Sequence, residues 1–137
     1  MYSIKSETKD NFYHIIICGG HTELNYEIIE TFILDVFKKL NIVDCEVVSG
    51  NRKGIDRLGE DFAFNNHFRT KIFPANWKAY GKSAGPIRNK EMVKYISKFN
   101  NSIVIAFWNG ESKGTKYTID EAKKYNIPVY VYNYSKT

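Results

Sequence analysis

Two basic residues lie between glycines in the segment 49–56 (SGNRKGID), directly after a short apolar run. A serine hydroxyl, backbone N–H groups and the cations Arg52 and Lys53 are the groups that bind phosphate where a helix begins. Asp56 falls in the first turn of that expected helix. It could contact a ribose hydroxyl or only interact with the helix dipole, and the residues leave both roles open. The segment predicts an anion site formed by Ser49, Gly50, Arg52 and Gly54, with Asp56 next to it.

A second turn of this kind, Gly19-Gly20, follows the apolar run 12–18 (FYHIIIC). Glycines allow a ligand to approach the backbone closely, although a plain strand-to-helix turn explains the same pair. His21 is compatible with an exposed turn or with a phosphate or sugar contact. The chain contains neither GxGxxG nor GxxxxGK[ST], which excludes the standard dinucleotide fingerprint and the P-loop.

Aromatic and basic side chains are interleaved in the segment 75–85, which holds Trp77 and Tyr80. Such a loop can stack a nucleobase and hold an anion, as proteins that bind single-stranded nucleic acid do. The alternative is that both rings only cover the edge of the fold.

Arg88 follows a proline that suits the first position of a helix, which would place the arginine in the first turn. A cation there opposes the helix dipole, and an anionic ligand would explain it. The loop 108–114 leads into another expected helix, where Lys113, Thr115 and Lys116 could hold a phosphate.

Catalytic and metal-binding patterns are absent from the sequence. There is no Ser-His-Asp, Cys-His or HExxH arrangement, and the three scattered histidines do not form a metal site. Thr118 and Glu121 have the spacing of a capping box, so a structural role explains Glu121 as well as an acid–base role does. We therefore predict no metal, no cofactor and no assignable catalytic residue.

The elements that must position these residues are short apolar runs in alternation with helical patterns. Strands are expected at 12–18, 45–49, 70–73, 102–107 and 128–132, helices at 24–40, 55–67, 86–99 and 115–125, and an irregular segment at 75–85. This alternation predicts an α/β fold: a Rossmann-like, doubly wound, mostly parallel five-stranded sheet with helices on both faces. Ligands bind at the carboxyl ends of such strands, so we expect all the glycine turns at one edge.

Composition fits one domain. The chain has 137 residues, 43% of them hydrophobic, and we expect a single domain over 12–137 after a flexible tail at 1–11. The two cysteines are too few for a disulfide scaffold, and no long apolar stretch predicts a membrane span or secretion. A cytoplasmic protein is the expectation, in a bacterium or, if phage-encoded, in its host.

Positive charge is concentrated in one part of the chain. The net charge is +5, and nine Lys or Arg but only three acidic residues lie within 52–90. This distribution favours a local anion site over a wide surface for extended nucleic acid.

Three stretches of the sequence resemble a known family: VVSGNRKGIDRLGEDFA (47–63), FPANWKAYGKSAGPIRNKEMVKY (73–95) and AFWNGESKGTKYTIDEAKKYNIPV (106–129). Together they resemble the YspA-type, cpYpsA-related branch of the SLOG superfamily of small Rossmann-like proteins, over about residues 13–132. The resemblance implies a nucleotide-type pocket above the carboxyl ends of the strands. The wider superfamily includes the LOG phosphoribohydrolases, the DNA-processing protein that binds single strands, and domains thought to sense nucleotide-derived signals.

Residue-by-residue comparison with the LOG enzymes separates binding from catalysis. Those enzymes carry an arginine early in the third helix, which Arg88 matches, and a PGGxGTxxE loop, whose GT matches Gly114-Thr115. Thr118 stands where the LOG glutamate needed for glycosidic cleavage would be, so the resemblance disfavours LOG-type catalysis and implies retained phosphate and ribose recognition. The carboxylates that could substitute are Asp56, Glu91, Asp120 and Glu121.

The leading hypothesis is a module that binds a nucleotide or a nucleotide-derived small molecule, such as an ADP-ribose-like signal, as a sensor or sequestering protein. The alternatives are a nucleoside-phosphate N-glycosidase and a protein that binds single-stranded nucleic acid. A homo-oligomer such as a dimer is compatible with the sequence. The expected ligand-binding residues are Gly19, Gly20, Ser49, Gly50, Arg52, Gly54, Asp56, Trp77, Tyr80, Arg88, Asn89, Gly114 and Thr115.

Overall fold

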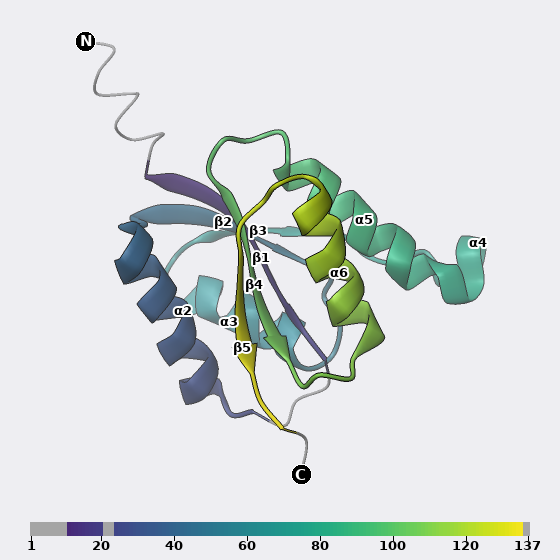
Figure 1. Cartoon of the computed structure of the whole chain (residues 1–137), viewed down its shortest axis with the longest axis horizontal. Helices are drawn as coiled ribbons and strands as arrows, with labels where there is room; N and C mark the ends of the chain where they lie inside the picture. The colour runs from purple at the N-terminus through teal and green to yellow at the C-terminus, as the bar shows by residue number, and fades with distance from the viewer. Residues whose placement is uncertain (1–10, 21–23, 136–137) are drawn as a thin grey trace.

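A five-stranded parallel sheet forms the centre of the molecule, with helices on both faces (Figure 1). The computed structural model describes residues 11–20 and 24–135. The strands are β1 (Phe12–Gly19), β2 (Asp44–Ser49), β3 (Arg69–Ile72), β4 (Ser102–Trp108) and β5 (Val129–Asn133). They lie in the order β3-β2-β1-β4-β5, and every pair of neighbours is parallel. The predicted fold class is confirmed. The expected tail at 1–11 and His21 lie, apart from Asn11, outside the described residues.

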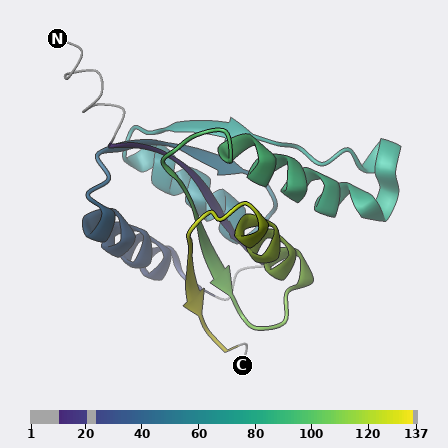
Figure 2. The ribbon, with the colours of Figure 1, turned by 45° about the horizontal axis from the view of Figure 1, so that its top comes forward.

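Four long helices cover the sheet in pairs. On one face lie α2 (Tyr26–Leu40) and α3 (Ile55–Asn65), and on the other lie α5 (Ala84–Ile96) and α6 (Lys113–Lys124). A short helix, α4 (Trp77–Tyr80), and a 3-10 turn (Gly81–Ser83) precede α5, and Figure 2 shows α4 projecting beyond the sheet. Within the described residues, no helix is long and apolar enough to span a membrane.

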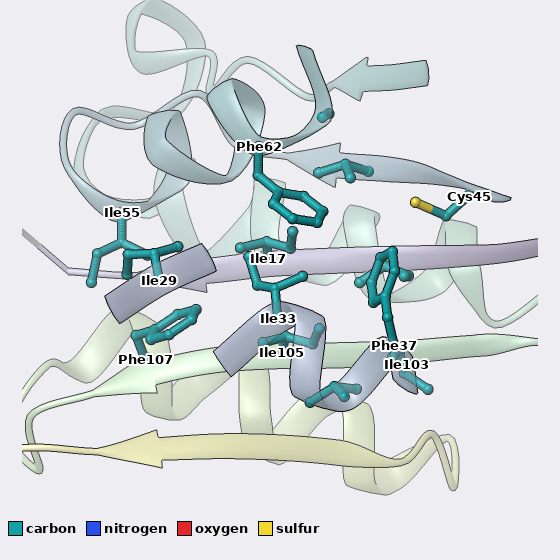
Figure 3. Packing of buried hydrophobic residues seen from close by; sticks show 14 of the residues in the cluster. Ile17, Ile29, Ile33, Phe37, Cys45, Ile55, Phe62, Ile103, Ile105 and Phe107 are labelled. Atoms are coloured by element: carbon teal, nitrogen blue, oxygen red, sulfur yellow. The ribbon is translucent and has the colours of Figure 1, made fainter. Parts of the chain in front are cut away.

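Successive side chains of the central strand enter two different cores. Ile15 packs with α2 and α3, as does Ile17 (Figure 3). Ile16 and Cys18 instead pack with α5 and α6. Side chains alternate between the faces of a strand, so a strand covered on both faces must be apolar at every position. This is why the run FYHIIIC shows no polar alternation over its last residues.

The expectation of an irregular segment at 75–85 was wrong. Asn76 caps α4 by accepting a hydrogen bond from the Ala79 N–H at 3.0 Å, and α5 begins at Ala84 rather than at Pro86. Pro86 is the third residue of α5, a position that needs no backbone donor because the first N–H groups of a helix have no partner within it. Arg88 consequently lies in the second turn of α5, not in the first.

The capping box expected at Thr118 and Glu121 was also wrong. Helix α6 begins at Lys113, and the Ser112 hydroxyl accepts the capping hydrogen bond from the Thr115 N–H at 3.3 Å. Thr118 and Glu121 therefore lie inside the helix, where Glu121 forms an ion pair with Lys124 at 2.8 Å.

Candidate functional site

Two adjacent hollows lie where β1, β2 and β4 end, and two arginines line both. The inner hollow, which we call the pit, has a volume of about 20 Å³, room for about one water molecule. The pit is lined by Cys18, Gly19, Arg52, Asp56, Arg88, Asn89, Met92, Gly114, Thr115 and Thr118. The outer hollow, which we call the groove, has a volume of about 210 Å³. The groove is lined by Gly50, Asn51, Arg52, Pro74, Ala75, Trp77 and Arg88.

Arg88 is a fixed, buried cation between the two hollows. Its side chain is 6% exposed, and its Nη1 donates to the Gly50 carbonyl oxygen at 2.7 Å. Its Nε donates to Asn89 Oδ1, also at 2.7 Å. Burial lowers the pKa of Arg88 from its usual value, and the nearby Asp56 carboxylate opposes that shift. Arg88 therefore ties α5 to the loop after β2 and keeps a positive charge in the wall shared by the hollows.

Arg52 is the exposed counterpart of Arg88. It lies in the loop between β2 and α3, and its Nη1 lies 3.7 Å from the point that a Cβ on Gly114 would occupy. The side chain thus spans from the start of α3 to the start of α6. An exposed arginine can change rotamer at low cost, so Arg52 can rearrange around an anion while Arg88 stays in place.

Asp56 is the carboxylate in the pit. Asp56 is 5% exposed, and its Oδ2 accepts a hydrogen bond from the Arg52 N–H at 3.4 Å. The carboxylate also forms a hydrogen bond with the backbone of Gly19. Burial raises the pKa of Asp56 to about 6, and the bond from the Arg52 backbone and the charge of Arg88 limit the rise. A carboxyl group whose pKa is raised this far inside a hollow is a candidate for function.

Two helix N-termini face the same place. α3 begins after Gly54, whose φ of 108° suits glycine, and α6 brings Gly114 and Thr115 of its first turn to the pit. The N-terminal ends of helices carry partial positive charge and unpaired N–H groups. Together with Arg52 and Arg88, they make this edge of the sheet suited to an anion such as a phosphate.

The structure brings most of the predicted ligand-binding residues to these hollows. Those that line the pit or the groove are Gly19, Gly50, Arg52, Asp56, Trp77, Arg88, Asn89, Gly114 and Thr115. Their role in binding stays a prediction.

Four predicted residues line neither hollow. Ser49 is buried, and its hydroxyl donates to Glu60 Oε2 at 2.6 Å and accepts from the Asn51 N–H at 2.9 Å, so it shapes the loop from inside. The Gly20 carbonyl accepts from the Ile55 N–H at 3.1 Å, and Gly54 starts α3. Tyr80 lies on α4 with 53% of its surface exposed.

Other residues of the hollows were not predicted to bind ligand. They are Cys18, Asn51, Pro74, Ala75, Met92 and Thr118. Asn51 carried a usable signal, because an asparagine in a glycine-rich turn readily adopts positive φ, here 57°. Cys18 and Met92 gave none, since both read as ordinary core positions; burial raises the pKa of the Cys18 thiol, which disfavours its reactive thiolate form.

The four carboxylates considered as candidates for catalysis differ in where they lie. Glu91 is exposed, Asp120 pairs with Lys116 at 2.8 Å, and Glu121 pairs with Lys124. Asp56 alone of the four lines the pit. Lys116 is directed to Asp120 rather than to the hollows. Across residues 11–20 and 24–135, no three His, Cys, Asp or Glu side chains form a group that could hold a metal ion.

Comparison with known proteins finds a family model that matches part of this chain. The model of the YspA, cpYpsA-related SLOG family matches residues 13–80. The chain is also 33% identical over 88 residues to the Gene 61 protein of Mycobacterium phage D29, covering 61% of this chain and 67% of that protein. The family match includes the loop after β2, Asp56 and Trp77, and ends before Arg88.

Proposed function

Because this chain belongs to the YspA, cpYpsA-related SLOG family, we propose that it binds a nucleotide or nucleotide-derived small molecule across the pit and the groove. Family membership suggests a nucleotide-related ligand-binding or glycosidase-like role in general. The observation that carries the specific proposal is the shared wall: Arg52 and Arg88 separate a polar pit from a groove with an aromatic side.

In the proposed complex the phosphate, the base and the ribose each contact different groups of the pit and the groove. The phosphate lies by Arg52 and the first turn of α6, where a movable cation and backbone N–H groups meet. The base lies in the groove against Trp77, which is 60% exposed and available for stacking. A ribose hydroxyl donates to the Asp56 carboxylate once Arg52 moves aside, because the pit now holds only about one water.

Ligand size follows from the volume of the groove. At about 210 Å³ it is below the roughly 300–1,000 Å³ of typical ligand pockets. The groove and the pit together therefore accommodate one nucleotide unit, and a longer ligand such as ADP-ribose extends into solvent. The role is that of a sensor or sequestering module, which requires binding without rapid turnover.

Calorimetry with mono-, di- and cyclic nucleotides, ADP-ribose and a single-stranded oligonucleotide at low salt tests the proposal. We expect Arg52→Ala to weaken binding of the preferred nucleotide about 10-fold or more, since hydrogen bonds to charged groups contribute about 1.5–3 kcal/mol. Lys53→Ala is the matched control, because Lys53 is the adjacent exposed cation and lines neither hollow.

Three outcomes contradict the proposal. They are no binding of any nucleotide, equal binding by Arg52→Ala and the wild type, or binding of the oligonucleotide alone. The last outcome would indicate a nucleic-acid site, whose affinity falls steeply with salt.

The position of Asp56 favours a second candidate, a slow nucleoside-phosphate N-glycosidase. A water in the pit would attack C1′ of the ribose as the C1′–N bond breaks. Asp56 accepts the proton of that water, the leaving base takes a proton from bulk water, and Asp56 then returns its own proton to bulk water. The products are a free base and a sugar phosphate, and a carboxylate near the sugar also stabilises the oxocarbenium-like transition state.

Long incubation with nucleoside monophosphates, followed by chromatography, tests this candidate. We expect free base from the wild type and none from Asp56→Asn, with Asp120→Asn as the control because that carboxylate is exposed and pairs with Lys116. Free base no higher than in a protein-free blank, or equal release by Asp56→Asn, would rule the activity out.

A further inference from the structure

The two edges of the sheet differ in charge. At one edge, β3 carries Arg69 and Lys71 and its residues are exposed. At the other edge, β5 (VYVYN) carries no charged residue, and no strand of the described residues lies beyond it. Charged residues on edge strands prevent pairing with other chains, and an uncharged edge lacks that protection. We propose that two copies of this chain pair through β5, antiparallel about a two-fold axis.

The backbone of β5 can pair with itself. The Pro128 carbonyl accepts from the Val104 N–H at 3.0 Å, and the Tyr134 N–H donates to the Trp108 carbonyl at 3.2 Å. Backbone groups alternate in direction along a strand, so those of Val129, Val131 and Asn133 point away from β4. A two-fold axis at Val131 pairs that residue with its equivalent, and Val129 with Asn133 of the second copy. The strand is thus self-complementary, as a two-fold interface requires.

A hollow beside β5 can receive side chains of the second copy. It has a volume of about 350 Å³, lies between α2 and β5, and includes Ile28, Phe32 and Tyr132 in its lining. Tyr132 already packs on Phe32, with ring centroids 5.4 Å apart. A two-fold axis at Val131 places Tyr130 of one copy opposite Tyr132 of the other on this face, and such cross-strand aromatic pairs stabilise sheets.

Charges near β5 are complementary under the same symmetry. Lys39, in the last turn of α2, lies over the Tyr130 ring at 5.7 Å, whereas Glu27 in the first turn and Asp35 line the hollow. The axis makes the two α2 helices antiparallel, so the basic end of one approaches the acidic hollow of the other. It also places the cation-rich segment 52–90 at the outer ends of the dimer, next to β3. A second copy is therefore the occupant that the charges favour.

Light scattering of the full chain over a range of concentrations tests the proposal. We expect a mass that rises to twice the 15.9 kDa of one chain. Val131→Pro removes a donor that points away from β4, so it keeps the fold and abolishes the dimer. Thr70→Pro is the matched control at the other edge: the Phe73 N–H bonds to the Ser49 carbonyl, so the Thr70 N–H points outward, and the dimer should persist.

A wild type that stays monomeric at every concentration overturns the proposal, as does a Val131→Pro protein that stays dimeric. If circular dichroism shows that Val131→Pro does not fold, Asn133→Pro replaces it, because the Asn133 side chain is exposed. That variant loses the pairs between Val129 and Asn133 at the two ends of the interface, so it should dimerise at least 10-fold more weakly. Unchanged dimerisation counts against the proposed dimer. These masses do not depend on any ligand, so they are independent of the proposed function.

Discussion

Arg88 and Gly50, 38 residues apart in the sequence, are joined by a 2.7 Å hydrogen bond from Nη1 to the carbonyl oxygen. The contact leaves no space for a side chain at position 50. A Cβ there would lie 2.5 Å from Nη1 and 2.8 Å from Cζ of Arg88. A side chain at position 50 would therefore displace the Arg88 guanidinium from its place between the pit and the groove.

Gly50→Ala should displace the guanidinium and destabilise the protein by about 1–3 kcal/mol, the usual cost of overpacking. In Arg88→Ala the obstacle is absent, so adding Gly50→Ala should cost much less. Urea unfolding of the two single variants and the double variant measures this coupling. Additive free energies of unfolding would show that the two residues do not interact as described.

Asp56→Asn should stabilise the protein at neutral pH, although it removes the carboxylate that lines the pit. The pKa of Asp56 is about 6 in the fold, above its ordinary 3.8. Between these values the folded state binds more protons than the unfolded state, so stability falls as pH rises. The variant lacks this loss. Its free energy of unfolding relative to that of the wild type should therefore rise by on the order of 2–3 kcal/mol between pH 4 and pH 7. Urea unfolding at both pH values measures the gain, and a pH-independent difference between the proteins would contradict the explanation.

Trp77→Ala should weaken nucleotide binding, and Tyr80→Ala should not. Both rings are more than half exposed on α4, but Trp77 lines the groove and Tyr80 lines neither hollow. Loss of one stacked base costs about 1–3 kcal/mol, roughly 5- to 150-fold in affinity. Calorimetry of the two variants, neither of which removes a buried side chain, distinguishes the rings. A larger effect from Tyr80→Ala would move the base to the outer side of α4.

Two glycine-to-alanine changes should separate stability from binding. A Cβ on Gly59 would lie 2.7 Å from Ile17 Cγ2, so Gly59→Ala should separate α3 from β1 and cost about 1–3 kcal/mol of stability. At Gly114 the nearest atom is Arg52 Nη1, at 3.7 Å, and alanine favours the helix, so Gly114→Ala should fold at least as stably. Thermal unfolding should show a loss of stability for Gly59→Ala alone. Calorimetry should show weaker nucleotide binding for Gly114→Ala alone. Full affinity in Gly114→Ala would indicate that the ligand does not approach α6.

The architecture of this protein follows from patterns that are local in the sequence. Apolar runs such as residues 12–18 are too continuous for a sheet with a solvated face, and their alternation with helical patterns leaves few arrangements besides a parallel sheet covered on both sides. The same reasoning placed the glycine turns at the carboxyl edge, because all strands in such a sheet point the same way. Helix boundaries were harder: α5 begins at Ala84 and α6 at Lys113, since Ser112 accepts the capping bond for which Thr118 had been the candidate.

From the sequence alone we could predict the fold, the edge of the sheet where the candidate site lies and the kinds of residue gathered there. The partners of those residues emerge only in the folded chain. It bonds Ser49 to Glu60 inside the loop, fixes Arg88 on the Gly50 carbonyl, and leaves Asp56 alone among the candidate carboxylates in the pit. The hydrophobic periodicity of a helix or strand shows which of its faces is buried, and it is visible in the sequence of that element alone. Hydrogen bonds and desolvation depend on atoms brought together from distant parts of the chain, and no spacing along the sequence encodes them.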